Sequence, residues 1–206
     1  MIKANHSYLG VLFFKYYSKI KLKNHFQDIR FVGDIEDLGK PILVISNHFS
    51  WWDGFIQLQL NNLLFKRKFH VMMLEEQLEK FKILNKGGAY SVQKNSRDIL
   101  NSLNYSVDLL NDNNNLLLIF PQGEIQSLYT DNFIFGTGLN YLLKNRKTDF
   151  QLIFNINLVD YFSESKPTLT IYFKEFIYSS NTNLQEIESD FNIFSVDCKS
   201  KQRKKD

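Results

Sequence analysis

The amino-acid sequence predicts an α/β fold: a single layered domain with a mixed, mostly parallel sheet flanked by helices, and an amphipathic helix at the N-terminus. Short apolar runs alternate with segments of helical periodicity along the chain, a pattern typical of partly parallel sheets. The 206 residues suit one compact domain with a sizeable core. With 44% hydrophobic and 23% charged residues, the chain has the composition of a globular protein.

The first predicted element is a helix from about residue 7 to residue 24. Its apolar residues share one face at helical spacing, opposite Lys15 and Lys19. Two interpretations are open: a helix packed on the domain core, or an amphipathic segment that lies on a lipid surface with its Lys residues among the headgroups. The residues of the apolar face are Leu9, Phe13, Tyr17 and Ile20.

Beyond this helix, strands are predicted where short apolar runs stand between polar segments, and helices where apolar residues return every three or four positions. The predicted strands are Ile29–Val32, Ile42–Ser46, Phe69–Met73, Ala89–Val92, Leu116–Phe120, Leu152–Asn157 and Leu169–Phe173. The predicted helices are Trp51–Leu64, Glu75–Phe81, Arg97–Leu110, Gly138–Asn145 and Leu184–Lys199.

The composition restricts the classes of function. A single cysteine, Cys198, excludes an internal disulfide and a cysteine-cluster metal site, and we interpret it as a structural thiol. The net charge of +3 permits an anionic partner, but without a dense basic stripe we expect no nucleic-acid binding. No apolar run reaches the roughly 18 to 20 residues that span a bilayer, and lysines interrupt the N-terminal stretch where a signal peptide would need to be apolar.

The segment that follows the strand Ile42–Ser46 carries the most chemical information. His48 comes directly after the strand, and Asp53 follows five residues later, at the start of the next helix. In α/β sheets, reactive groups gather just past the carboxyl ends of strands. If the loop folds back, the carboxylate of Asp53 can hold one imidazole nitrogen of His48, so that the other nitrogen can remove a proton from a hydroxyl.

A purely structural interpretation of the same residues is also open. Ser50 and Asp53 have the spacing of a helix capping box, in which Asp53 would only satisfy a backbone N–H. His70 followed by Glu75 nearly repeats the spacing of the first pair, but His70 lies inside a predicted strand. We therefore interpret His70 as a packed or solvated histidine.

Two further strand ends add polar groups. The apolar run Leu116–Phe120 breaks into Pro121-Gln122-Gly123-Glu124, where the glycine permits a tight turn and a close backbone approach. The strand that begins after Gly88 ends near the cation Lys94. Together the three strand ends are typical of a site that holds an anionic acceptor beside a base, although Lys94 alone would be an ordinary surface lysine and Pro-x-Gly alone an ordinary turn.

These segments, in this order, resemble the glycerolipid and lysophospholipid acyltransferase family. The family's first motif, Asn-His-x4-Asp, is matched by Asn47, His48 and Asp53, and its third, Phe-Pro-Glu-Gly-Thr, by Phe120, Pro121 and Gly123. The second motif, a Gly-led strand ending in Arg, has Lys94 in the Arg position; Gln122 and Glu124 depart from the third motif; and the Pro of the fourth is missing at Ile153-Phe154-Asn155. Phe133-x-x-Gly136 resembles the family's Phe-Lys-x-Gly.

We divide the chain into an amphipathic, membrane-associated helix at 1–26, an acyltransferase domain at 27–200 and a charged tail at 201–206; the resemblance covers roughly residues 40 to 160 and implies the acyltransferase character of the domain. It implies that His48 is the general base, oriented by Asp53, and that an acyl thioester on CoA or acyl carrier protein is the donor, with neither a metal nor another cofactor. The family works at the cytoplasmic face of membranes, which implies a peripheral or monotopic protein with membrane lipid as partner. The implied substrate-binding residues are Asn47, Ser50, Lys94, Pro121, Gln122, Gly123 and Glu124, with backbone N–H groups of the glycine turn as oxyanion donors.

The departures from the family pattern leave the acceptor open. Lys in place of Arg keeps the charge but loses the planar fork that suits phosphate, and Gln122 lacks the carboxylate of the family's Glu. A lysophospholipid, an aminoacyl lipid or a pigment hydroxyl are each compatible with this sequence. A catalytically silent lipid-binding protein with the same fold is the alternative function.

Overall fold

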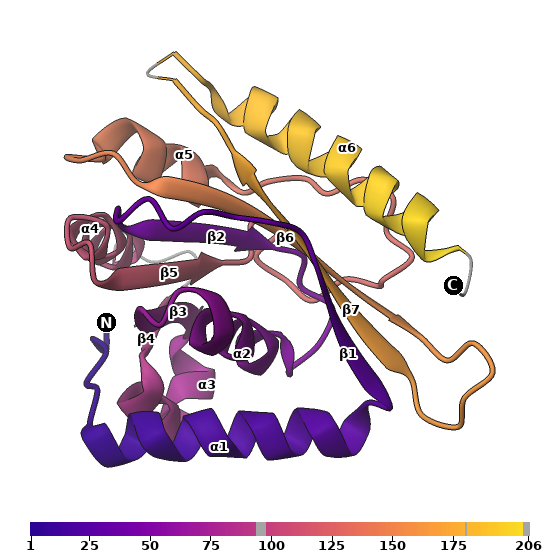
Figure 1. The fold of residues 1–206 in the computed structure, drawn as a ribbon. Helices are drawn as coiled ribbons and strands as arrows, with labels where there is room; N and C mark the ends of the chain where they lie inside the picture. The colour runs from indigo at the N-terminus through magenta and orange to yellow at the C-terminus, as the bar shows by residue number, and fades with distance from the viewer. Residues whose placement is uncertain (94–97, 180, 204–206) are drawn as a thin grey trace.

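The computed structural model describes residues 1–93, 98–179 and 181–203, and it confirms the α/β fold. A seven-stranded sheet in the order β1-β7-β6-β2-β5-β3-β4 forms the centre of the molecule (Figure 1). All neighbouring strands are parallel except β6 and β7, which are antiparallel. Strands β2 to β6 therefore share one direction, and their carboxyl ends meet at one edge of the sheet.

Every predicted strand and helix is present, with ends shifted by a few residues. The strands are β1 Asp28–Val32, β2 Ile42–Ser46, β3 Lys68–Leu74, β4 Ala89–Val92, β5 Asn115–Ile119, β6 Gln151–Asp160 and β7 Thr168–Phe176. The helices are α1 Tyr8–His25, α2 Asp53–Leu64, α3 Glu75–Lys80, α4 Ile99–Leu109, α5 Thr137–Asn145 and α6 Leu184–Gln202. The 3-10 helix η1, Lys82–Gly87, was not predicted, because it has no apolar periodicity of its own.

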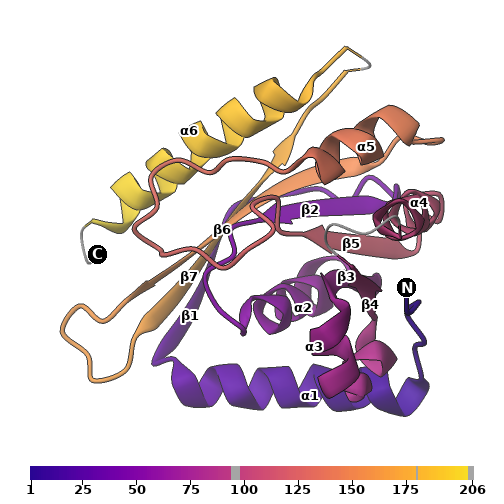
Figure 2. The same cartoon turned by 180° about the vertical axis from the view of Figure 1, so that it is seen from behind.

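Helices cover both faces of the sheet, and the alternation of side chains along β2 shows how. Leu43 and Ile45 point into a core shared with α4, α5 and α6, whereas Ile42 and Val44 point into a second core shared with α1 and α2. Figures 1 and 2 show these two layers on opposite sides of the sheet. The apolar run of β2 is continuous because both faces of the strand are buried.

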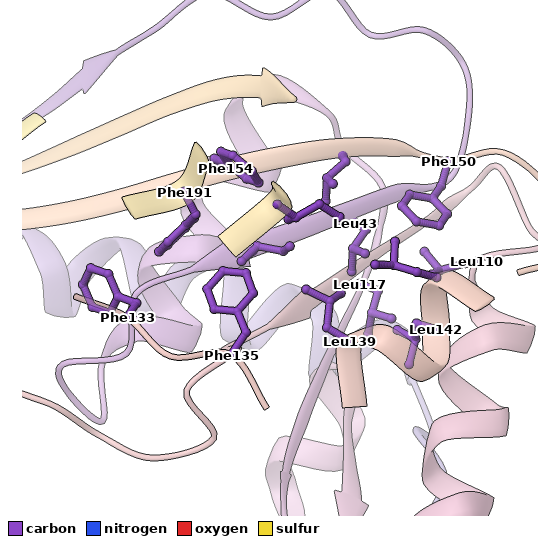
Figure 3. Packing of buried hydrophobic residues seen from close by; sticks show 14 of the residues in the cluster. Leu43, Leu110, Leu117, Phe133, Phe135, Leu139, Leu142, Phe150, Phe154 and Phe191 are labelled. Atoms are coloured by element: carbon purple, nitrogen blue, oxygen red, sulfur yellow. The ribbon is translucent and has the colours of Figure 1, made fainter. Parts of the chain in front are cut away.

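The core beneath α4, α5 and α6 is rich in aromatic rings. Phe191 of α6 makes edge-to-face contacts with Phe154 of β6 and with Phe133 and Phe135 (Figure 3). Phe133 and Phe135 belong to the segment between β5 and α5, and both are buried. This packing holds the segment that follows β5 against α6, and therefore fixes the loop that begins at Pro121.

Helix α1 packs on α2 and η1, but with a different face from the one the sequence suggested. The residues it buries are Phe14, Ser18 and Leu22. Leu9 is 75% exposed and Ile20 is 58% exposed, so most of the apolar face points away from the domain. Packing of the helix on the core is confirmed, and Tyr17 contributes to it, but Leu9, Phe13 and Ile20 of the predicted face point outward.

The turn into β4 leads to a stability prediction. Gly88 has φ +110°, and a Cβ at this position would lie 1.9 Å from the carbonyl oxygen of Phe69. We expect Gly88→Ala to lower the free energy of unfolding by clearly more than the ~1–2 kcal/mol that a left-handed residue costs, as measured by urea denaturation. Gly39, with φ +69° and open space around it, is the matched control, and Gly39→Ala should cost only the backbone part; equal losses would contradict the prediction.

Candidate active site

His48 and Asp53 meet at the carboxyl end of β2. The Nδ1 atom of His48 lies 2.7 Å from Oδ2 of Asp53, so the loop does fold back as the spacing requires. The side chain of Asp53 is fully buried, whereas that of His48 is 22% exposed. A carboxylate can only accept a hydrogen bond, so Nδ1 carries the proton. When the ring carries a single proton, its lone pair is therefore on Nε2, which has no hydrogen-bond partner among the described residues.

The carboxylate of Asp53 also organises the start of α2. Its Oδ2 atom accepts the backbone N–H of Phe49 at 2.7 Å and of Ser50 at 2.9 Å, and its Oδ1 atom accepts the hydroxyl of Ser50 at 3.0 Å. The Ser50 hydroxyl oxygen in turn accepts the N–H of Trp52. Helix α2 itself begins at Asp53, with Trp52 at its N-cap and no side-chain hydrogen bond at that cap, so these bonds shape the turn that leads into the helix. Of the capping-box interpretation, the bond from the Ser50 N–H to Asp53 is present, and the same carboxylate also holds the imidazole.

The imidazole of His48 is fixed from two other directions. Its ring stacks on Phe120, with ring centroids 4.1 Å apart and planes 14° from parallel. The backbone carbonyl of His48 accepts the N–H of Gln126 at 2.8 Å. Phe120 and Gln126 both follow β5, the neighbour of β2 in the sheet, so the two parallel strands together hold the ring in place.

An apolar cavity of about 530 Å³ opens beside His48, within the ~300–1,000 Å³ typical of small-molecule sites. Its walls come from α1, α2, β3, α4 and α5 as well as from the loops after β2 and β5. Most of the lining side chains are aliphatic, aromatic or methionine. They include Phe14, Trp51, Phe55, Leu58, Phe69, Val71, Met72, Met73, Leu84, Leu103, Ile119 and Leu139.

The structure divides the candidate substrate-binding residues into two groups. Pro121, Gly123 and Glu124 line the cavity together with His48. Asn47 does not: it is 3% exposed, and its amide bonds the backbone of β6. The hydroxyl of Ser50 is similarly committed to the turn that leads into α2. Both side chains are used in holding the loop, and their direct contact with substrate stays a prediction.

Three other expectations concern the polar groups around the glycine turn. The N–H of Gly123 bonds the carbonyl of Phe120 at 3.1 Å and so closes the turn; that backbone N–H groups of this turn act as oxyanion donors stays a prediction. The side-chain amide of Gln122 is buried without a hydrogen-bond partner among the described residues, and Gln122 does not line the cavity. Lys94 lies outside the described residues.

Other reactive side chains have structural surroundings. His70 is buried and bonds Asn115 at 3.1 Å, and burial, together with the neighbouring His6, lowers the pKa of His70 to about 4. Burial also raises the pKa of the Cys198 thiol to about 12. Both residues are therefore packed neutral groups, as we interpreted Cys198. Within residues 1–93, 98–179 and 181–203, no three His, Cys, Asp or Glu side chains are grouped as a metal site would require.

Sequence reasoning missed the walls of the cavity. Phe14 from α1 and Phe55 from α2 are far apart in the chain, and both have the spacing of ordinary core residues. One signal was available in β3, where residues on both faces are only partly buried although the strand lies inside the sheet. Such a strand must border a hollow space, but this is visible only after burial is known.

Known proteins share both the sequence pattern and the fold. A protein-family model described as Acyltransferase matches residues 19–159, more than half of the 206 residues. Among solved structures, the fold is similar to the crystal structure of the 1-acyl-sn-glycerophosphate (LPA) acyltransferase PlsC from Thermotoga maritima, with a TM-score of 0.63 and 13% identity, covering 95% of this chain and 81% of that chain. No curated protein sequence matches the chain significantly.

The double use of Asp53 leads to a prediction about stability. Asp53→Ala removes the acceptor of two backbone N–H groups, each worth roughly 1–3 kcal/mol when left buried and unpaired, so we expect a loss of several kcal/mol. Asp53→Asn keeps a carbonyl oxygen and should lose less. His48→Ala loses the stack on Phe120, about 1 kcal/mol, and one donor to the carboxylate, but the N–H groups of Phe49 and Ser50 keep their acceptor, so its loss should be smaller than that of Asp53→Ala. Urea denaturation of the three variants checks this order, and a loss in His48→Ala as large as in Asp53→Ala would contradict it.

Proposed function

The chain belongs to the acyltransferase family, and on this premise we propose that it transfers a fatty acyl group from an acyl thioester to a hydroxyl of a lysophospholipid or related lipid acceptor. The observation that carries the proposal is the bond between His48 and Asp53 beside an apolar cavity. A base that can act on a hydroxyl and a space that can hold an alkyl chain are the two things this reaction needs.

The proposed chemistry uses one base and no covalent intermediate on the protein. The Nε2 atom of His48 takes the proton of the acceptor hydroxyl while its oxygen attacks the thioester carbonyl. The buried carboxylate of Asp53 stabilises the imidazolium that forms and keeps the ring in the required tautomer. As the tetrahedral intermediate collapses, the C–S bond breaks, the new ester is left behind, and the imidazolium returns its proton to the thiolate.

The cavity supports a long acyl chain as the transferred group. Its lining is almost entirely apolar and includes His48, so an alkyl chain in the cavity can have its carbonyl carbon near the base. Acyl-CoA and acyl carrier protein thioesters present the same reactive group, and both are donors in this proposal. No cofactor beyond the thioester is required.

The proposed acceptor follows from the family and from the name of the similar structure. The Thermotoga maritima structure is named for a 1-acyl-sn-glycerophosphate acyltransferase, and a lysophospholipid is the proposed acceptor here. Among the described lining residues, Glu124 is the one Asp, Glu, Lys or Arg side chain. This carboxylate favours a headgroup that offers a hydroxyl or a cation to it, so an aminoacyl lipid or pigment hydroxyl also belongs in the substrate test.

Membrane association is the second part of the proposal. Helix α1 presents Leu9, Phe13, Tyr16 and Ile20 to the outside, each 48% exposed or more, and Lys15, Lys19 and Lys23 are exposed on the same helix. Apolar side chains flanked by lysines suit an interface with anionic headgroups. In the described residues, no helix has the length and apolarity that a membrane crossing requires. We propose peripheral or monotopic attachment at the cytoplasmic face, as the resemblance to the family implies.

The role of His48 is tested by substitution. We expect His48→Ala to lose at least about 100-fold in turnover, the range that general-base catalysis supplies, while far-UV circular dichroism stays unchanged. Purified protein would be given acyl-CoA and acyl carrier protein thioesters with each acceptor class, and lipid products measured by mass spectrometry. His25→Ala, a histidine on the outer helix α1, is the matched control. Unchanged turnover in His48→Ala would refute the mechanism, and a wild type without turnover would favour the silent lipid-binding protein.

The role of α1 is tested on vesicles. We expect the double variant Leu9→Glu and Phe13→Glu to bind vesicles of mixed neutral and anionic phospholipid at least 10-fold more weakly than the wild type, because carboxylates replace the side chains that would enter the interface. Sedimentation measures the bound fraction. Ile193→Glu is the matched control, since Ile193 is 62% exposed on α6, in the opposite layer. An equal loss in the control, or no loss in the α1 variant, would contradict the proposal.

A further inference from the structure

A group of buried polar side chains lies directly behind the catalytic pair, between β2, α2 and β6. Each of these side chains is at most 3% exposed. They lie where two parallel strands and a helix meet, a region that apolar side chains normally fill. The group, which we call the amide cluster, consists of Ser46, Asn47, Gln57, Asn155 and Asn157.

Asn47 extends the sheet by one step after the backbone has left it. The ladder between β2 and β6 ends where Ser46 pairs with Asn155. Beyond that point, the side-chain amide of Asn47 donates to the carbonyl of Asn157 at 3.0 Å and accepts the N–H of Asn157 at 2.9 Å. These are the two bonds that a paired strand would make. Because a side chain makes them, the backbone is free to turn at His48 toward Asp53.

Gln57 connects the cluster to the helix that carries the carboxylate. It lies one turn after Asp53 on α2, so the two side chains leave the same face of the helix. Its amide donates to Oδ1 of Asn155 and, at 3.4 Å, to the hydroxyl of Ser46. The Ser46 hydroxyl donates to the same Asn155 oxygen at 2.8 Å. The rotation of α2 is thereby tied to the end of β2, the strand that delivers His48.

Stability alone does not explain the amide cluster. Two of its oxygens, Oε1 of Gln57 and Oδ1 of Asn157, are buried without a hydrogen-bond partner among the described residues. A partly satisfied polar network is less stable than an apolar core of the same shape. Hydrogen bonds are directional, so those of the amide cluster restrict the orientation of α2 relative to β2 and β6. Apolar contacts alone would restrict this orientation less.

We propose that Gln57 and Asn47, through the amide cluster, are positioning residues for the His48–Asp53 pair. Asn47 sets where the chain leaves β2, and Gln57 sets the rotation of α2, so the two together fix the separation of the imidazole and the carboxylate. Neither residue lines the cavity, so neither contacts the substrate there. The inference rests on the proposed function, because it assigns these residues to the reaction of His48.

The experiment replaces the two residues by leucine, separately, and measures kcat, KM and the low-field proton resonance of His48 Nδ1–H. A displacement of about 1 Å can cost 100-fold in rate, so we expect kcat to fall roughly 10- to 100-fold in Gln57→Leu and in Asn47→Leu, with KM changed less than threefold. The His48 resonance, assigned by its loss in His48→Ala, should shift or broaden. Gln57→Met is a milder variant in case either leucine variant does not fold.

Gln151→Leu is the matched control. Gln151 is a buried amide on the same strand, β6, and pairs with Ile42 at the opposite end of β2. We expect this variant to lose stability in urea while keeping kcat and the His48 resonance of the wild type. A similar fall of kcat in Gln151→Leu would mean that any buried amide of β6 has the same effect, and would overturn the proposal.

The resonance separates this inference from the proposed function. If the wild type shows no turnover with any thioester, the proposed function fails, and the response of the resonance in Gln57→Leu still decides whether the cluster positions the pair. If both leucine variants keep the wild-type resonance, the positioning role is refuted, whether kcat falls or not.

Discussion

The carboxylate of Asp53 is the point on which the site depends. It is fully buried and collects four hydrogen bonds, from the imidazole of His48, the backbone of Phe49 and Ser50, and the Ser50 hydroxyl. A buried charge is costly unless donors surround it, and here the donors are the loop itself. The loop therefore has one favourable conformation, and in that conformation the imidazole is held. Helix start, loop shape and imidazole orientation are consequences of one interaction.

The sheet explains why that interaction lies beside the cavity. Strands β2 and β5 are parallel neighbours, so the loops after them leave the same edge. One loop brings His48, and the other brings Phe120, which stacks on its ring, and Pro121, Gly123 and Glu124, which line the cavity. The packing of Phe133 and Phe135 against α6 keeps the second loop in place. A parallel pair of central strands thus converts two distant segments into one site.

The sequence predicted the elements well and the side-chain assignments less well, for a physical reason. Strands such as Ile42–Ser46 are apolar throughout because both faces are buried, and this signal is local. The contact of His48 with Asp53 is local too, since the four residues between them limit where the carboxylate can go. Whether Asn47 faces substrate or β6 depends on a strand more than 100 positions away, and no local pattern carries that information. The same holds for α1, where periodicity defined an apolar face but could not show which way it points.

Helix α1 joins the two halves of the proposed function. Phe14 lines the cavity, while Phe13, the preceding residue, is 48% exposed on the outer side. The helix lies close to η1: a Cβ on Gly87 would lie 2.5 Å from the Phe14 ring. The glycine therefore allows α1 to pack closely enough for Phe14 to line the cavity. If α1 rests on a bilayer, the cavity is then separated from the lipid by the thickness of one helix. A lipid tail could pass from membrane to cavity around this helix with little exposure to water, and exposure of an alkyl chain to water is the main cost of moving a lipid. The placement of one helix as both cavity wall and outer face is therefore the physical link between the proposed acyl-chain site and the proposed membrane attachment.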